Sequence, residues 1–173
     1  GKVEYFPAHR SLPPPGVAAG ISAAEQRLLR TTKDPRKYSF VPRLIALMGS
    51  SSELSERFAN TLSRLSPTVR FVPGSPADPL RCFSSRGGLA LLPHELSGTE
   101  EDAVILASTA VLVRLERSIL FIDRPEKATD EKGFAPWLDG VHAMAPGAQV
   151  ILASSSASVL ANLEPRAVVQ LGA

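Results

Sequence analysis

The chain has 173 residues, of which 44% are hydrophobic and 21% are charged, a composition typical of one globular domain. Its 19 Lys and Arg residues nearly balance its 17 Asp and Glu residues, so the charge does not indicate a nucleic-acid coat. The single cysteine, Cys82, excludes an internal disulfide and a cysteine-based zinc site. No apolar run is long enough to cross a bilayer and no signal-peptide pattern is present, so a cytoplasmic location is expected.

The first half of the chain predicts one strand followed by a helical and irregular insertion. Polar and apolar residues alternate over residues 2–6, which predicts a short strand, and a stiff proline-rich segment follows at residues 12–16. Apolar residues at helical spacing predict three helices, over residues 22–30, 40–48 and 52–65. Short apolar runs between residues 68 and 92 are separated by Pro, Gly and Ser, which predicts a small antiparallel meander.

The second half alternates helices and strands. The expected order is a helix over residues 97–115, a strand over 119–123, a helix over 134–143, a strand over 149–153, a short helix to about 162 and a last strand over 167–171. This order is typical of right-handed crossovers, so the predicted fold class is α/β, a parallel sheet flanked by helices. The four apolar residues from Ile119 to Ile122 are expected to be buried on both faces of that sheet.

Three positions of this pattern are expected to lie on one rim of the sheet. Asp123 ends one strand and Ser155 follows the next, and the carboxyl ends of neighbouring parallel strands meet at the same edge. Ser97 begins the helix that precedes them, and the free N–H groups of a helix start can bind an anion. A carboxylate in the position of Asp123 often holds Mg²⁺ in nucleotide-binding proteins. This rim is therefore the candidate site of the chain.

The same residues also have plain structural interpretations, which the sequence leaves open. Asp123 can cap the turn that follows its strand, and Ser97 can be an ordinary helix cap. Arg124 can form an ion pair with Glu126 or Asp130. None of these roles needs a ligand.

Four segments resemble the carboxyl-terminal half of an ABC-type ATPase, in particular the bacterial AAA-labelled ATPases built on the ABC and SMC head pattern of the P-loop NTPase superfamily. The segments are residues 94–101 (HELSGTEE, like the signature loop), 115–126 (LERSILFIDRPE, like the Walker B strand), 149–158 (QVILASSSAS, like the switch segment) and 3–10 (VEYFPAHR, like a Y-F-P-A-x-R stretch). The resemblance implies one P-loop NTPase-like domain over residues 1–173. Residues 1–10 would supply its first strand, residues 11–91 the insertion and residues 92–173 the three motifs.

The resemblance also assigns roles to residues and shows where the chain departs from the family. Asp123 matches the candidate Mg²⁺ ligand, and the residues expected to contact a nucleotide held by a partner are Ser97, Gly98 and Thr99. No G-x-x-x-x-G-K-[ST] segment occurs in the 173 residues. Arg124 stands where the family has its catalytic Glu, and a guanidinium cannot accept a proton. Ser155 stands in place of the switch His, so no catalytic residue is assigned, and ATP with Mg²⁺ is expected only together with a P-loop partner.

Four functions are compatible with these patterns. The first is a degenerate, non-hydrolysing ATPase-like domain that acts as a binding or regulatory subunit. Two others supply activity with a partner: a chain that offers its signature-like loop in trans, or the carboxyl-terminal part of a split ATPase. The fourth is an interaction module that docks through Pro13–Pro15. A protein partner or a homodimer is expected, because an incomplete parallel sheet leaves an apolar edge or face open unless residues 3–6 cover it.

Overall fold

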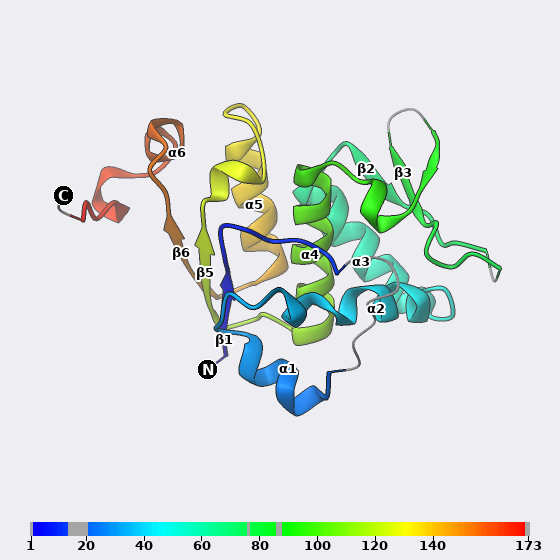
Figure 1. The fold of residues 1–173 in the computed structure, drawn as a ribbon. Helices are drawn as coiled ribbons and strands as arrows, with labels where there is room; N and C mark the ends of the chain where they lie inside the picture. Colours follow the sequence, from blue (N-terminus) through cyan, green and yellow to red (C-terminus); the bar gives the residue numbers. More distant parts are fainter. Residues whose placement is uncertain (1, 14–20, 76, 86–87, 172–173) are drawn as a thin grey trace.

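The computed structural model describes the chain except for residues 1, 14–20, 76, 86–87 and 172–173. It has a parallel sheet on one side, a small antiparallel sheet on the other, and helices between them (Figure 1). The parallel sheet comprises β1 (Val3–Phe6), β5 (Ile119–Asp123) and β6 (Gln149–Ala153), in the order β1-β5-β6. The antiparallel sheet comprises β2 (Val69–Phe71), β3 (Phe83–Ser85) and β4 (Ala90–Leu91). The α/β fold class and the meander are therefore confirmed.

The helices follow the predicted order closely. They are α1 (Ala23–Leu29), α2 (Phe40–Met48), α3 (Ser52–Leu65), α4 (Gly98–Val113), α5 (Phe134–Met144) and α6 (Ala157–Ala161). Short 3₁₀ turns lie at Pro35–Tyr38, Pro93–Glu95, Pro125–Lys127 and Pro165–Ala167. Serine hydroxyls cap two of these helices, since Ser22 accepts the Glu25 N–H at 3.1 Å and Ser97, the predicted cap of α4, accepts the Glu100 N–H at 3.4 Å.

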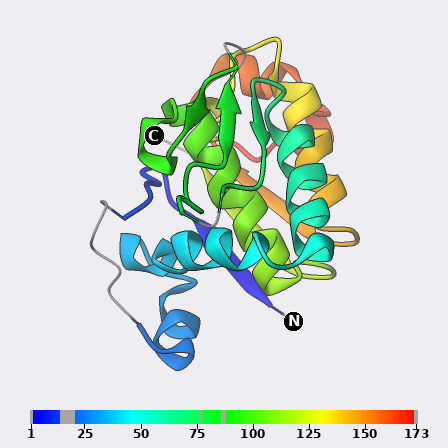
Figure 2. The same ribbon diagram turned by 90° about the vertical axis from the view of Figure 1, so that its right-hand side faces the viewer.

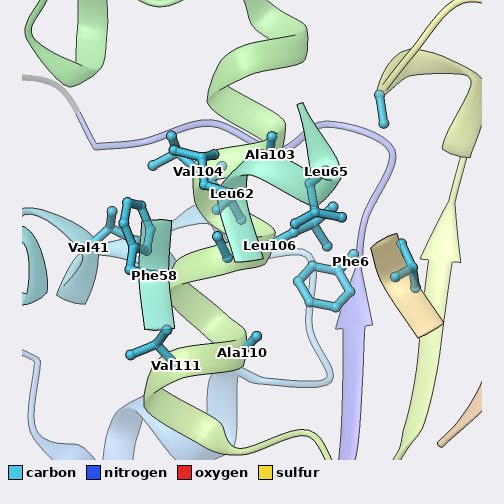
Figure 3. Close-up of a cluster of buried hydrophobic side chains, with 14 of the residues drawn as sticks. Phe6, Val41, Phe58, Leu62, Leu65, Ala103, Val104, Leu106, Ala110 and Val111 are labelled. Carbon is cyan, nitrogen blue, oxygen red and sulfur yellow. The ribbon is translucent and has the colours of Figure 1, made fainter. Parts of the chain in front are cut away.

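Helix α4 is the centre of the core. Its residues from Ala103 to Val111 are all buried, as its apolar composition on every side predicts. Helix α3 packs across it, and Figure 3 shows Phe58 and Leu62 of α3 against Val104 of α4. Figure 2 shows α3 beside the small antiparallel sheet, with α4 behind both. Phe58 fills this junction, because its ring centroid lies 5.0 Å from that of Phe71 in β2.

The parallel sheet is covered on one face only, which corrects the expectation that β5 is buried on both. Leu120 and Ile122 point into the core and are at most 1% exposed, together with Phe6 of β1. The side chains between them face outward: Phe121 is 38% exposed and Ile151 in β6 is 37% exposed. An apolar run cannot reveal this difference, because its side chains alternate between the faces whether or not a second layer covers them.

Two further expectations about the ends of the chain have definite outcomes. The predicted last strand over residues 167–171 is wrong, since Val168 to Leu171 pair with no strand and Leu171 is 86% exposed. The predicted strand at residues 2–6 is confirmed as β1, and it takes a place in the sheet beside β5 in parallel register. Most of the proline-rich segment, including Pro14 and Pro15, lies outside the described residues.

Candidate functional site

The carboxyl ends of β1, β5 and β6 and the start of α4 lie at the same end of the molecule (Figure 1). We call this end the rim, and it comprises residues 7–10, 97–102, 123–127 and 153–156. The strands share it because all three are parallel, with Phe6 opposite Ile122 and Asp123 opposite Ala153 in the register. The predicted grouping of the helix start with the two strand ends is therefore present in the fold.

The buried side chain of Arg10 joins the elements of the rim. The Arg10 side chain is 2% exposed, and its Nε atom forms an ion pair with the buried carboxylate of Asp102 in α4. Its Nη2 atom donates a hydrogen bond to Asp102 Oδ2 at 3.1 Å. Nη1 donates to the carbonyl oxygens of Pro7 at 2.9 Å and Asp123 at 3.0 Å. Burial raises the pKa of Asp102, and the charge of Arg10 opposes that shift. One side chain thus fixes α4 relative to the ends of β1 and β5.

Sequence reasoning missed this pair. Arg10 is part of the VEYFPAHR segment, so the resemblance indicated the residue but gave it no role. Asp102 reads as one of several acidic residues in the first turns of a helix, where a carboxylate favours the helix dipole without any partner. One signal could have indicated the pair. Arg10 follows the first predicted strand and Asp102 lies in the first turns of the helix predicted over residues 97–115, so the predicted topology brings a cation and a carboxylate to the same rim.

Asp123 lies at the carboxyl end of β5 with its side chain half-buried. Its Oδ2 atom accepts a hydrogen bond from Tyr5 Oη at 3.3 Å, across the open face of the sheet. Loss of solvent contact and the nearby charge of Asp123 both raise the pKa of Tyr5. Within the described part of the chain the Asp123 carboxylate accepts no backbone N–H, so the interpretation of Asp123 as a cap of the following turn is wrong.

Arg124 turns the chain away from the strand. Its φ of 52° places it in the left-handed region, and its backbone N–H donates to the Ala153 carbonyl oxygen at 2.8 Å. Its side chain is exposed and forms no ion pair with any residue that the structure describes, so the predicted pairing with Glu126 or Asp130 is wrong. Glu126 instead accepts the hydroxyl proton of Ser154 at 2.7 Å. The guanidinium of Arg124 is therefore available to an external anion.

The serine loop after β6 lies beside this turn. Ser154 accepts the Ser156 backbone N–H at 3.0 Å, and its bond to Glu126 ties the ends of β5 and β6 together. Ser155 is exposed between them. Its hydroxyl is short and reaches no other described side chain through a hydrogen bond, so Ser155 has no structural role in holding the loop.

The helix start at Ser97 is exposed and internally satisfied. Ser97 and Glu100 form a reciprocal capping box, in which Glu100 Oε2 accepts the Ser97 N–H at 3.0 Å. The plain interpretation of Ser97 as a helix cap is thus confirmed. Gly98 and Thr99 are exposed beside it. Among the described residues no hydrogen bond joins these three positions to Asp123, Arg124 or Ser155, so the rim presents two separate groups of candidate residues.

The residues of the rim fit a metal only in part. Among the described residues no group of three or more His, Cys, Asp or Glu side chains is arranged to hold a metal ion. A Mg²⁺ ion that is bound through one carboxylate and the phosphates of a nucleotide needs no such group, and Asp123 is a carboxylate of that kind. Lys127, whose Nζ lies 3.4 Å from His9 Nδ1, adds a positive charge to the rim. Within the described ranges no helix is both long and apolar enough to span a membrane.

Known proteins resemble this chain in structure rather than in sequence. No protein-family model matches the chain, and no curated protein matches it. The Smc head bound to the C-winged helix domain of ScpA is 16% identical over 79% of this chain, with a TM-score of 0.46. The Smc head domain with a coiled coil and joint derived from Pyrococcus yayanosii is 17% identical over 66% of this chain, with a TM-score of 0.45. A structure from work on ATP-driven dimerization and DNA-stimulated activation of SMC ATPases is 16% identical over 70%, with a TM-score of 0.46.

The chain is shorter than most of the proteins that it resembles. It covers 46% of the first of these chains, 24% of the second and 78% of the third. It therefore spans about half the length of the Smc head that was solved with the winged-helix domain.

Proposed function

We propose that the chain is a non-hydrolysing ABC-type ATPase-like domain that acts as a binding or regulatory subunit. The observation that carries this proposal is the pair of residues at the end of β5, where a half-buried carboxylate is followed by an exposed arginine. Asp123 can contribute to a Mg²⁺ site, whereas Arg124 cannot accept a proton from an attacking water. Ser155, in the position of the switch His, is exposed and too short to reach far beyond the loop.

The chemistry of the rim favours binding of phosphate over its hydrolysis. Hydrolysis of a phosphoanhydride requires a group that orients or deprotonates water, together with electrostatic stabilisation of the transferred phosphoryl group. The described rim offers the second kind of group in Arg124 and Lys127, and Asp123 is its carboxylate at the strand end. Arginine recognises phosphate oxygens through its fork of N–H donors. Nucleotide held at this rim would therefore be recognised and not turned over.

The absence of turnover can be tested by measuring ATP binding and ATP hydrolysis by the purified chain, with and without Mg²⁺. We expect the rate of phosphate release to equal the background rate and to be the same for the Asp123→Asn variant, because Arg124, at the catalytic position, cannot accept a proton from water. Glu131→Gln is the matched control, because it changes another acidic residue, in the segment between β5 and α5. A phosphate-release rate that falls in Asp123→Asn but not in Glu131→Gln would contradict the proposal.

A second candidate function has one observation in its favour. The chain can be the carboxyl-terminal part of an ATPase whose P-loop belongs to a partner, to which it offers Ser97, Gly98 and Thr99. The open face of the parallel sheet supports this interpretation, since each strand contributes one exposed apolar residue to it: Val3 in β1, Phe121 in β5 and Ile151, which lies beside Phe121, in β6. Sheets of this parallel kind are ordinarily covered on both faces. A third candidate, docking through Pro13–Pro15, has no such support.

The edges of the sheet indicate where that partner would approach. The outer edge of β1 is occupied, because the Tyr5 N–H donates to the Arg30 carbonyl oxygen at 3.2 Å and Lys37 Nζ donates to the Tyr5 carbonyl oxygen. Among the strands that the structure describes, β6 pairs with β5 alone and is the other edge of the sheet. Its sequence, QVILA, contains no proline or charge that would discourage pairing. We therefore place the partner on the open face and at the β6 edge.

We expect the chain to associate, most simply as a dimer, through this open face. Replacing Phe121 by Lys puts a charge on the middle strand of the open face and should give a monomer in light scattering, because a buried unpaired ammonium is costly. Leu112→Lys is the matched control, since Leu112 is a similarly exposed apolar residue, 44% against 38%, on α4 and outside the sheet. A wild-type chain that is monomeric at high concentration, or equal effects of the two variants, would contradict this expectation.

A further inference from the structure

A groove of about 290 Å³ lies between α3, α4 and α5, away from the rim. Its lining includes the last turns of α4 and α5 and the loops that lead into β5 and β6, which are at the amino ends of the strands. The long wall of the groove is α3, which packs against both other helices. The groove therefore belongs to the end of the molecule opposite the rim, and the proposed function makes no use of it.

Four polar residues of α3 line one wall of this groove. They are Arg57, Asn60, Thr61 and Arg64, and their spacing of three, four and seven positions places them on one face of the helix. Thr61 Oγ1 donates to the Arg57 carbonyl oxygen at 2.9 Å, so its hydroxyl proton is already used. Over the described ranges neither arginine side chain forms an ion pair or a hydrogen bond. Two guanidinium groups thus stand beside the groove with all of their donors available.

The rest of the lining is apolar apart from one carboxylate. Val111 and Met144 contribute apolar surface at the ends of α4 and α5. Glu116 is the single acidic residue in the lining, so the two arginines outnumber it. The loop that carries Glu116 also holds Arg117, which is exposed and unpaired among the described residues. The groove therefore combines two arginines of α3 with apolar side chains from the ends of α4 and α5.

We propose that this groove binds a small organic oxyanion, whose charged group is held by Arg57 and Arg64 while its apolar part lies against Val111 and Met144. The planar fork of arginine matches the oxygen geometry of both phosphate and carboxylate. The volume is close to the lower end of the range for small-molecule sites, roughly 300–1,000 Å³, which suits a compact ligand and not a long peptide. The negative charge of Glu116 repels an anion, and this repulsion grows with the charge of the ligand. The groove therefore favours a ligand with a low negative charge.

The test is a titration of the purified chain with phenyl phosphate, followed by NMR chemical shifts or calorimetry. Benzoate and inorganic phosphate are titrated in parallel, and they distinguish a carboxylate ligand from a phosphate ligand and show whether the apolar part is needed. We expect Arg57→Gln and Arg64→Gln each to weaken binding of the tighter aromatic anion by about tenfold, because each removes charge-assisted hydrogen bonds. Glu116→Gln should tighten the same binding, since it removes the only negative charge from the lining.

Arg43→Gln is the matched control, because Arg43 is an exposed arginine on α2 that does not line the groove and forms no ion pair with the residues that the structure describes. It should leave the affinity unchanged. The site is supported if binding is saturable, is weakened by Arg57→Gln and Arg64→Gln, and is tightened by Glu116→Gln. Absence of saturable binding for all three anions would overturn the proposal. So would equal weakening by Arg43→Gln, or an affinity that none of the groove variants changes.

Discussion

Replacing Arg10 by Met is expected to lower the free energy of unfolding by about 3–5 kcal/mol. The substitution keeps an unbranched side chain as long as the apolar stem of arginine, but it leaves Asp102, whose side chain is 6% exposed, without its counter-charge in the core. It also removes the donors to the carbonyl oxygens of Pro7 and Asp123 at the rim. Urea unfolding followed by circular dichroism at neutral pH measures this change.

Two further variants separate loss of the pair from loss of packing. Changing both partners, Arg10→Met with Asp102→Leu, should recover much of the lost stability, because no uncompensated charge is then buried. Arg166→Met breaks an ion pair of short distance, 2.6 Å, between side chains that are 86% and 67% exposed, and should have no measurable effect. If Arg10→Met were as mild as Arg166→Met, the assignment of Arg10 as the residue that joins the rim would be wrong.

The stability of the chain should fall as the pH rises from about 4.5 to about 7, because Glu4 is buried without a hydrogen-bond partner. Glu4 is 3% exposed, and its Oε2 atom accepts no hydrogen bond from the described residues. Its nearest cations are Arg30 Nε at 3.9 Å and Lys37 Nζ at 4.0 Å. Lys37 directs its protons elsewhere, since it donates to the carbonyl oxygens of Tyr5, Arg30 and Thr32.

Burial raises the pKa of Glu4 from its ordinary value of 4.5 to about 7, against the opposing charges of Lys37 and Arg30. Between these two pH values the folded chain binds more protons than the unfolded chain, so the free energy of unfolding decreases with rising pH. This shift in the pKa of Glu4 corresponds to a decrease of about 3 kcal/mol in the free energy of unfolding across that pH range. Lys37 acts in a separate window, because burial lowers its pKa to about 8 and its contribution therefore rises with pH above that value.

The measurement is urea unfolding at several pH values between 4.5 and 8, for the wild type and for Glu4→Gln. Glutamine resembles the protonated glutamate and does not titrate, so most of the slope due to Glu4 should disappear. Glu25→Gln is the matched control on α1, since the Glu25 side chain is 43% exposed, and its slope should equal that of the wild type. Glu101 and Asp102, whose pKa values burial also raises, keep their contributions in both variants. A Glu4→Gln chain with the full wild-type slope would show that Glu4 is ionised in the fold.

Much of the local structure follows from short stretches of sequence. Ser22 and Ser97 start their helices because a hydroxyl placed before a helical run accepts a free N–H of the first turn. The apolar middle of α4 predicts that it is buried on all sides, and the alternation of helices with β5 and β6 predicts a parallel sheet. The position of Asp123 at the end of β5 is fixed by the same local pattern, since the apolar run stops there.

The tertiary structure alone decided which of these elements meet and what they leave uncovered. The sequence determined helix caps, strand ends and the residues that stand at the motif positions, because each depends on neighbours within a few positions. It could not determine that Arg10 pairs with Asp102, or that Glu4 is buried beside Lys37, because burial of a charge depends on segments far away along the chain. Nor could it show that Phe121 faces solvent, since a continuous apolar run has the same sequence whether the second face of its strand is covered by another layer or open to a partner.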